Sequence, residues 1–241
     1  MLLKLENPKL FTDIISIIAE LVTEVKLKVN AEGLSLTAVD PANAAMVHFT
    51  MPADLFAQFE IKQNEVLGLN LENLKAVLRR CKIGSSLILQ KEDNKLKLSI
   101  QDRIKRDFTL ALLDIDAEEK EVPQWEFDSV IKMNSEDFVE VIEDFAIVSD
   151  ACSIIAEPNK FIIEAQGLNA ARAEFSSDEV EIHSGNSMAR YSLEYLSKFI
   201  KGAKISARVS VNFSSNHPIR INFPTGKVML SFILAPRIEE D

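Results

Sequence analysis

Residues 10–39 read LFTDIISIIAELVTEVKLKVNAEGLSLTAV, and residues 137–166 read DFVEVIEDFAIVSDACSIIAEPNKFIIEAQ. When the first stretch is shifted by 127 positions onto the second, most of its apolar residues fall on apolar residues, and the alignment needs no gap. Phe11 meets Phe138, for example, and Leu34 meets Phe161. Self-similarity over this length indicates an internal repeat, and a repeat determines the architecture before any single element does.

A second block of the repeat extends the match toward the end of each half. Residues 71–82 match residues 193–204 at a shift of 122. Two similar halves of roughly 120 residues follow, which is an ordinary domain size. Between them, residues 114–126 are strongly acidic, contain Pro123 and show no clean period, as expected of an exposed connector. We therefore predict domains at 1–113 and 127–241, joined by a connector at 114–126.

Each half has the same succession of hydrophobic periods: an amphipathic helix, several strands, a second amphipathic helix and further strands. The first helix follows Asn7 and Pro8, and its counterpart starts at Ser135. Few helices and many alternating strands predict an α+β fold, with the helices on one face of antiparallel sheets.

Composition excludes several classes of protein. The chain has 241 residues, 47% of them hydrophobic, and only two cysteines, so neither a disulfide framework nor a CxxC site is expected. We predict no signal peptide and no membrane span, and a reducing intracellular environment. The net charge of −10 argues against a polyanionic partner unless the basic residues are concentrated on one surface.

Catalytic and cofactor signatures are weak. The three histidines, His48, His183 and His217, are far apart and belong to no metal-ligand spacing, so we expect no metal, no cofactor and no enzymatic activity. Gly226 and Lys227 resemble the end of a phosphate loop, but the first glycine of that motif is absent.

Several short runs carry a resemblance to a known family. They are Asp40 with its loop, the run 113–116 entering the connector, Val122 and Pro123 leaving it, the run 148–150, and the terminal run 234–240. On these residues the whole chain resembles the proliferating cell nuclear antigen family of DNA sliding clamps, and its compact loops are similar to the archaeal members. The resemblance implies a non-enzymatic processivity factor of DNA polymerase, located in the cytoplasm and associated with the nucleoid if the source is archaeal. It also implies a trimeric ring of six domains that encircles double-stranded DNA. Implied partners are a clamp loader, DNA polymerase, flap endonuclease and DNA ligase.

The sequence places basic residues on the second helix of each half, off the apolar stripe, and by resemblance Arg79 and Lys201 face DNA. The predicted DNA-facing residues are Lys9, Lys75, Arg79, Arg80, Lys82, Lys198, Lys201 and Lys204. The helix that starts at Ser135 departs from the family pattern, since it is acidic and has no basic residue. Weak, salt-sensitive contact with DNA is therefore expected, with retention by ring closure.

The resemblance also implies subunit edges and a partner site. Two alternating strands, 105–111 and 178–183, are expected to pair between subunits, and the alternative is that both are ordinary internal strands. The predicted interface residues are Lys105, Arg106, Phe108, Leu110, Ala111, Phe145, Glu179, Val180, Glu181, Ile182 and His183. The predicted site for a partner peptide consists of Val39, Asn43, Ala44, Met46, Lys120, Val122, Pro123, Phe127, Pro218, Leu234, Ala235, Pro236 and Ile238. Lys120 departs from the apolar residue often found there in the family.

Two other functions stay open on the sequence. One is an enzyme that uses dispersed acidic residues, and the other is a scaffold of clamp fold that does not close around DNA. Whether a ring is made of three identical chains or of paralogues is also open, because both assemblies use the same edges.

Overall fold

The computed structural model describes residues 1–116 and 120–238, apart from the side chain of residue 184. Residues 117–119 of the predicted connector, and Glu239 and Glu240 of the terminal run, lie outside the described residues. The described chain divides into two compact units. The first contains residues 1–39, 47–116, 120–122 and 226–229, and the second contains residues 40–46, 123–225 and 230–238.

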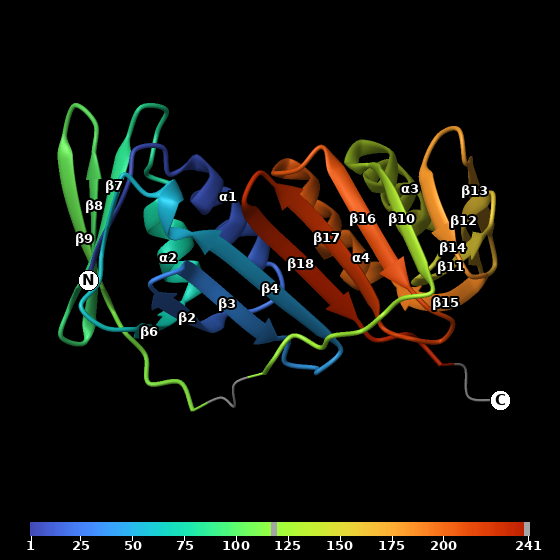
Figure 1. The fold of residues 1–241 in the computed structure, drawn as a ribbon, viewed down its shortest axis with the longest axis horizontal. Coiled ribbons are helices and arrows are strands. Elements are labelled where there is room, and N and C mark those ends of the chain that lie inside the picture. Colours follow the sequence, from blue (N-terminus) through green and yellow to red (C-terminus); the bar gives the residue numbers. More distant parts are fainter. Residues whose placement is uncertain (117–119, 239–241) are drawn as a thin grey trace. The chain divides into compact units, whose positions relative to one another are not determined.

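The elements of the first half follow one another in the order shown in Figure 1. They are β1 (Leu2–Leu5), α1 (Lys9–Ile18), β2 (Glu24–Asn30), β3 (Gly33–Val39), β4 (Ala45–Pro52), the 3-10 turn η1 (Ala53–Leu55), β5 (Gln58–Glu60), β6 (Glu65–Asn70), α2 (Leu71–Leu78), β7 (Ser86–Glu92), β8 (Lys95–Gln101) and β9 (Lys105–Ala111).

The second half repeats this order almost element for element. It consists of β10 (Ser129–Asn134), α3 (Ser135–Val148), β11 (Ala151–Glu157), β12 (Lys160–Gln166), β13 (Ala170–Ser176), β14 (Glu181–Ser184), β15 (Ser187–Ser192), α4 (Leu193–Phe199), the 3-10 turn η2 (Ile200–Lys204), β16 (Arg208–Phe213), β17 (Ile219–Thr225) and β18 (Val228–Leu234). The predicted duplication is confirmed, because β2 and β3 correspond to β11 and β12 at the shift of 127.

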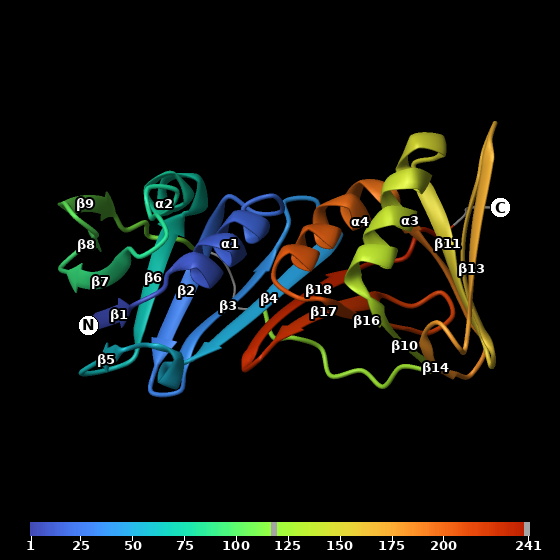
Figure 2. The same cartoon turned by 90° about the horizontal axis from the view of Figure 1, so that it is seen from above.

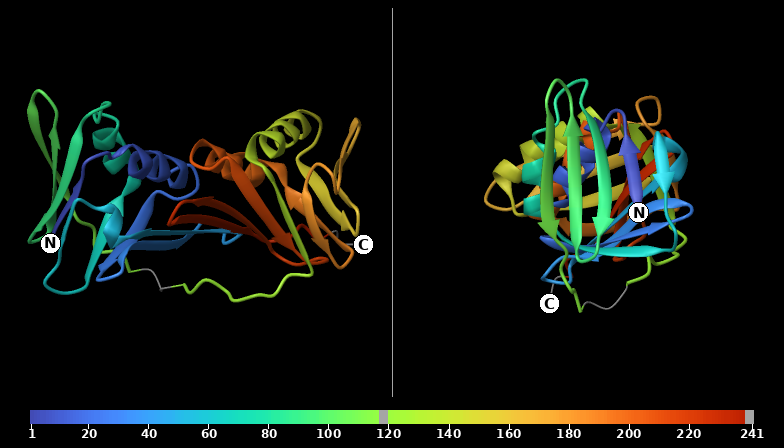
Figure 3. Two further views of the ribbon diagram at one scale, coloured as in Figure 1. Left: turned by 45° about the horizontal axis from the view of Figure 1, so that its top comes forward. Right: turned by 90° about the vertical axis from the view of Figure 1, so that its left-hand side faces the viewer.

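Strand pairing repeats as well. In the first half the strands are ordered β5-β1-β7-β8-β9 and β4-β3-β2-β6, and in the second half β14-β10-β16-β17-β18 and β13-β12-β11-β15. Strand β13 is thus the counterpart of β4, and β18 is the counterpart of β9. The right-hand view of Figure 3 shows β7, β8 and β9 side by side, with β9 at the edge.

The helices of each unit pack as a pair on one face of its strands, α1 with α2 and α3 with α4 (Figure 2). Helix α1 begins after Pro8, and the Asn7 side chain accepts a hydrogen bond from the Lys9 amide at 3.1 Å. Helix α3 begins at Ser135, as predicted, and Asn134 caps it by accepting from the Glu136 amide at 2.8 Å. The α+β class and the placement of the helices are confirmed.

The apolar stripes of these helices form the core on that face. Phe11, Ile14 and Ile18 of α1 are almost completely buried, as are Phe138 and Ile142 of α3. Burial of each such side chain stabilises the folded state by about 1.5–3 kcal/mol relative to leaving it exposed.

Candidate nucleic-acid interface, subunit edges and partner site

Three of the predicted DNA-facing residues gather in the first unit, where the start of α1 meets the end of α2. Lys9, Arg79 and Lys82 line one cavity of about 420 Å³. Its other walls are Asn7, Pro8, Thr12, Asp13, Leu78, Cys81, Ile83 and Gly84. Arg79, Arg80 and Lys82 are exposed, so their charges are available to a ligand.

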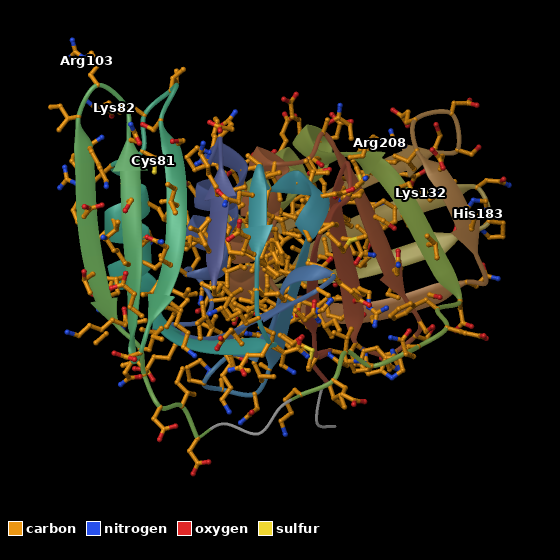
Figure 4. The ribbon with its side chains drawn as sticks, turned by 60° about the vertical axis from the view of Figure 1, so that its left-hand side comes forward. Cys81, Lys82, Arg103, Lys132, His183 and Arg208 are labelled. Atoms are coloured by element: carbon orange, nitrogen blue, oxygen red, sulfur yellow. The ribbon has the colours of Figure 1, made fainter. Side chains whose placement is uncertain are left out.

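In Figure 4, Lys82 and Arg103 project at the same end of this unit. Their loops lie side by side, with the Ser85 hydroxyl 3.5 Å from the Asp102 carboxylate. The end of α2 and the neighbouring loop therefore form one basic surface.

Lys75 differs from the prediction. Its side chain is only 10% exposed, and its ammonium pairs with Glu20 at 3.5 Å and with Glu72 at 3.2 Å. The aliphatic stem lies on the packed face of α2, where α2 meets α1. This charge is already neutralised, so Lys75 does not belong with the exposed basic residues.

The predicted basic residues of the second unit lie on α4 and η2. Lys198 is partly exposed, pairs with Glu194 at 3.3 Å and lies 5.2 Å from the centre of the Tyr195 ring. Lys201 and Lys204 are exposed, one 3-10 turn apart. These three cations thus share one stretch of chain in this unit.

Helix α3 carries the opposite charge. Its acidic residues are all exposed, and none of them has an ion pair among the residues described: Glu136, Asp137, Glu140, Glu143 and Asp144. An exposed helix face with five uncompensated carboxylates repels phosphate and attracts cations.

Two edge strands have inward faces that are only half-buried. In both β9 and β13 exposed residues alternate with partly buried ones, and no residue of either strand is fully buried. Their counterparts differ, because β18 and β4 bury every inward residue. Phe108 and Leu110 on β9, and Phe175 on β13, are therefore apolar side chains that lack complete cover within the chain.

The predicted strand 178–183 is wrong in its first part. Residues 178–180 form a turn, in which the Glu179 carboxylate accepts from the Ser176 amide at 2.8 Å and from its hydroxyl at 3.0 Å. Only Glu181–Ser184 form a strand, β14, which pairs with β10 and is also an edge. Val180 and Phe145 are 5% exposed, so both are packed inside their own unit.

Around β14 the outer surface carries a separate set of charges. Figure 4 shows Lys132, His183 and Arg208 projecting from β10, β14 and β16. Glu181 pairs with Lys132 at 3.3 Å and with Arg208 at 3.0 Å. Exposed His183 and Ile182, which is partly buried, complete the predicted residues on this strand.

The loop that begins at Asp40 is part of the predicted partner site. The Asp40 carboxylate accepts hydrogen bonds from the Ala44 and Ala45 amides at 2.8 and 2.7 Å, and from the Tyr195 hydroxyl at 2.6 Å. Burial alone would raise the pKa of Asp40, but these hydrogen bonds outweigh it and hold the pKa below its ordinary value. The hydrogen bond to Asp40, with burial, raises the pKa of Tyr195 to about 12. Sequence reasoning missed Tyr195.

The end of the connector packs on the second unit through an aromatic cluster. Trp125 lies edge-to-face against His217, with ring centres 4.8 Å apart, and against Phe127 at 6.2 Å. The Arg220 guanidinium lies 5.5 Å from the Phe127 ring centre and donates to the Pro123 carbonyl. Burial lowers the pKa of Arg220. The predicted residues Pro123 and Phe127 thus belong to one cluster, to which Trp125 and His217 must be added, and the predicted Pro218 follows His217 directly in the chain.

The C-terminal tail lies on the same unit. The Ala235 amide donates to the Ala44 carbonyl at 2.9 Å, and the Arg237 amide donates to the Arg190 carbonyl at 2.7 Å. The tail thereby joins the Asp40 loop, which contains Asn43, Ala44 and Met46. Leu234 is buried, Pro236 is partly buried and Ile238 is 79% exposed. The remaining predicted residues, Val39, Lys120 and Val122, belong to the first unit.

Other candidate chemistry is sparse in the described part of the chain. No group of three or more histidine, cysteine, aspartate or glutamate side chains is arranged there to hold a metal ion. Burial raises the pKa of the Cys152 thiol to about 12, which disfavours the reactive thiolate. No described helix has the length and apolar character needed to cross a membrane.

Comparison with known proteins gives one consistent result along the whole chain. The family model for the N-terminal domain of proliferating cell nuclear antigen matches residues 1–120, and the model for its C-terminal domain matches residues 121–238. A DNA polymerase sliding clamp of Thermococcus fumicolans is 30% identical, over 98% of this chain and 97% of its own. One of Pyrococcus furiosus is 29% identical over the same shares. The crystal structure of proliferating cellular nuclear antigen from Entamoeba histolytica shares the fold, with a TM-score of 0.93, 24% identity and 98% of each chain covered.

Proposed function

The chain belongs to the proliferating cell nuclear antigen family, and from this premise we propose that three copies close into a ring around double-stranded DNA. As a member of that family it is a DNA polymerase sliding clamp, a processivity factor without catalytic activity. The observation that carries the ring proposal is the pair of half-covered edges, β9 and β13, on the two halves of a duplicated chain.

Ring closure by β9 of one subunit on β13 of the next would cover both inward faces. The counterparts β18 and β4 are fully buried on those faces. Strands in the same position of the repeat are therefore already covered within the chain. A heterologous contact of this sort closes into a ring when the rotation between subunits fits a whole number of copies. We therefore prefer β13 to β14 as the second edge.

The same junction would explain the acidic helix α3. Helix α2 packs beside β9 and helix α3 beside β13, so joining the two edges would bring α2 of one subunit next to α3 of its neighbour. The exposed Arg80, just after α2, would then face the uncompensated acids of α3. Charge complementarity of this kind fixes the register of an interface and suppresses wrong pairings.

For DNA we propose weak contacts from Lys9, Arg79, Lys82, Lys198, Lys201 and Lys204, while Arg80 is assigned to the contact with α3. Neutralising few phosphates gives little affinity, and that affinity falls with salt. Retention would then depend on the closed ring. Lys75 is left out because its charge is neutralised by Glu20 and Glu72.

For partners we propose that a peptide with an aliphatic anchor and aromatic residues binds along the tail and the connector end. The supporting residues are the exposed Ala235 and Ile238 and the cluster of Trp125, Phe127 and His217. A peptide strand can add backbone hydrogen bonds to an extended tail. Clamp loader, DNA polymerase, flap endonuclease and DNA ligase are the proposed carriers of such peptides, in an archaeal cytoplasm.

The native mass of the purified chain tests the assembly. Three copies of the 27.0 kDa chain give ~81 kDa, and we expect this mass without any other protein present. A stable monomer at micromolar concentration would contradict closure by identical chains and would favour a ring that needs paralogous subunits.

A further inference from the structure

A second cavity lies in the second unit, between β15, the turn before Pro218 and the C-terminal tail. Its volume is 520 Å³, and the residues that matter for its chemistry are Ser153, Met188, Arg190, Asn216, Arg237 and Ile238. Two of these six are arginines, and neither belongs to the partner site predicted from the sequence.

The walls of this cavity are fixed by hydrogen bonds. The Arg237 amide donates to the Arg190 carbonyl at 2.7 Å, and the Asn216 amide donates to the Met188 carbonyl at 3.1 Å. The Met188 amide in turn donates to the Ser215 hydroxyl at 3.1 Å. Tail, turn and strand are thus tied together, so a ligand entering here meets preformed walls.

The charge of the cavity comes from its two arginines, and Arg237 pairs with one exposed carboxylate. Arg237 donates to Asp150 at 3.1 Å, and the Asp150 side chain is 82% exposed. The hydrogen bond from Arg237 lowers the pKa of Asp150, and the charge of Arg190 contributes. Because Asp150 is in solvent, a better-enclosed carboxylate can replace it on Arg237 at little cost.

The rim of the cavity is apolar and exposed. Met188 is 51% exposed and Ile238 is 79% exposed. Ile238 also belongs to the proposed partner site, and Ser215 and Asn216 lead directly into His217 and Pro218. A peptide bound along the tail would therefore pass the mouth of this cavity.

We propose that this cavity is a carboxylate subsite, which binds an aspartate or glutamate side chain flanking the hydrophobic anchor of a partner peptide. The planar guanidinium of Arg237 offers paired donors that match a carboxylate, and Arg190 adds a second positive charge. This inference rests on the proposed partner site and adds to it a preference for acidic flanks.

The test uses the assembled clamp and synthetic peptides with one aliphatic anchor and two aromatic residues. A single glutamate is moved along both flanks, and each peptide is compared with its glutamine twin by isothermal titration calorimetry. At one position we expect glutamate to bind about three- to tenfold more tightly than glutamine, with the gain reduced by salt.

Variants of the arginines locate the gain. In Arg237→Gln and Arg190→Gln the glutamate preference should disappear while the glutamine peptide still binds. Arg237→Glu should instead prefer a lysine at the same position. The matched control is Arg208→Gln, an exposed arginine of the same unit that pairs with Glu181 outside the cavity, and it should keep the preference.

If an arginine variant loses its fold, Asp150→Asn keeps the inference testable. Removing this competing carboxylate should tighten the glutamate peptide, whereas Asp54→Asn, which breaks an exposed pair with Lys227 in the other unit, should not. Equal binding of glutamate and glutamine twins at every position would overturn the subsite and leave the partner site standing. Failure of every peptide to bind would overturn the partner site as well.

Discussion

At the scale of single residues, Asp40 determines the shape of the loop on which the proposed partner site is built. Its buried carboxylate accepts hydrogen bonds from the amides of Ala42, Ala44 and Ala45 and from the hydroxyl of Tyr195. The tail is attached to the same loop through Ala44. Loss of the Asp40 charge would therefore loosen both the loop and the tail.

Tyr195→Phe removes one of these hydrogen bonds without changing the shape of the side chain. We expect the free energy of unfolding to fall by about 1.5–3 kcal/mol at neutral pH, the usual contribution of a hydrogen bond to a charged group. Because the folded pKa of Asp40 is lowered, its stabilising contribution is present above the unfolded pKa and is lost as pH falls through the folded pKa. Urea titrations at several pH values should show the variant and the parent converging in acid. A constant difference down to the lowest pH would contradict this role.

Lys75 and Arg79 form a matched pair on α2 with different expected roles. Lys75→Gln should lower the melting temperature, because it removes the ammonium that pairs with the carboxylates of Glu20 and Glu72. Its affinity for DNA should stay the same as that of the parent. Arg79→Gln should weaken the binding of a short linear duplex at low salt, while the melting temperature of the protein stays the same. Fluorescence anisotropy and calorimetry distinguish the two, and an exchange of these effects would place Lys75 at the DNA surface.

At the scale of elements, hydrophobic periodicity was sufficient for the helices and for most strands. Strand β9 matches its predicted bounds, and the stripes of α1 and α3 are buried as expected. The strand expected at 178–183 failed because alternation cannot detect the turn that Glu179 stabilises with Ser176. Strand β13 was missed because alanine occupies three of its seven positions and gives little hydrophobic contrast.

Substitutions on β13 and β14 discriminate between the two candidate edges. Ala173→Lys places a charge on the half-covered face of β13, so we expect the ring to dissociate into folded monomers. His183→Lys on β14 is exposed and should leave the assembly intact. Analytical ultracentrifugation gives the answer, and dissociation by the β14 variant alone would restore the edge predicted from the sequence.

Charge reversal on α3 tests the proposed contact with α2. Glu140→Lys together with Asp144→Lys should weaken the trimer, because like charges would then face each other across the junction. Arg80→Glu in the same chain should restore part of the lost association. The parent trimer should also dissociate more readily at high salt, where exposed charges are screened. No recovery in the triple variant would argue that α3 faces something other than α2.

At the scale of the whole molecule, the duplication and the family resemblance were sufficient to predict a clamp from the sequence. The individual side-chain contacts became known only from the structure. The sequence pointed to the two basic clusters but could not show that Lys75 is neutralised by residues outside its own turn. Nor could it place Tyr195, Trp125 and His217 beside the proposed partner site, because their contacts join segments far apart in the chain. Sequence spacing reports neighbours on one element, while sites combine several elements.

Retention on DNA of different topology tests the clamp most directly. The purified protein, loaded on nicked circular DNA, should remain bound through a high-salt wash and should be lost rapidly once the circle is cut. A ring held by closure rather than by affinity requires this difference. Equal loss from circular and linear DNA, or equal retention on both, would contradict encirclement.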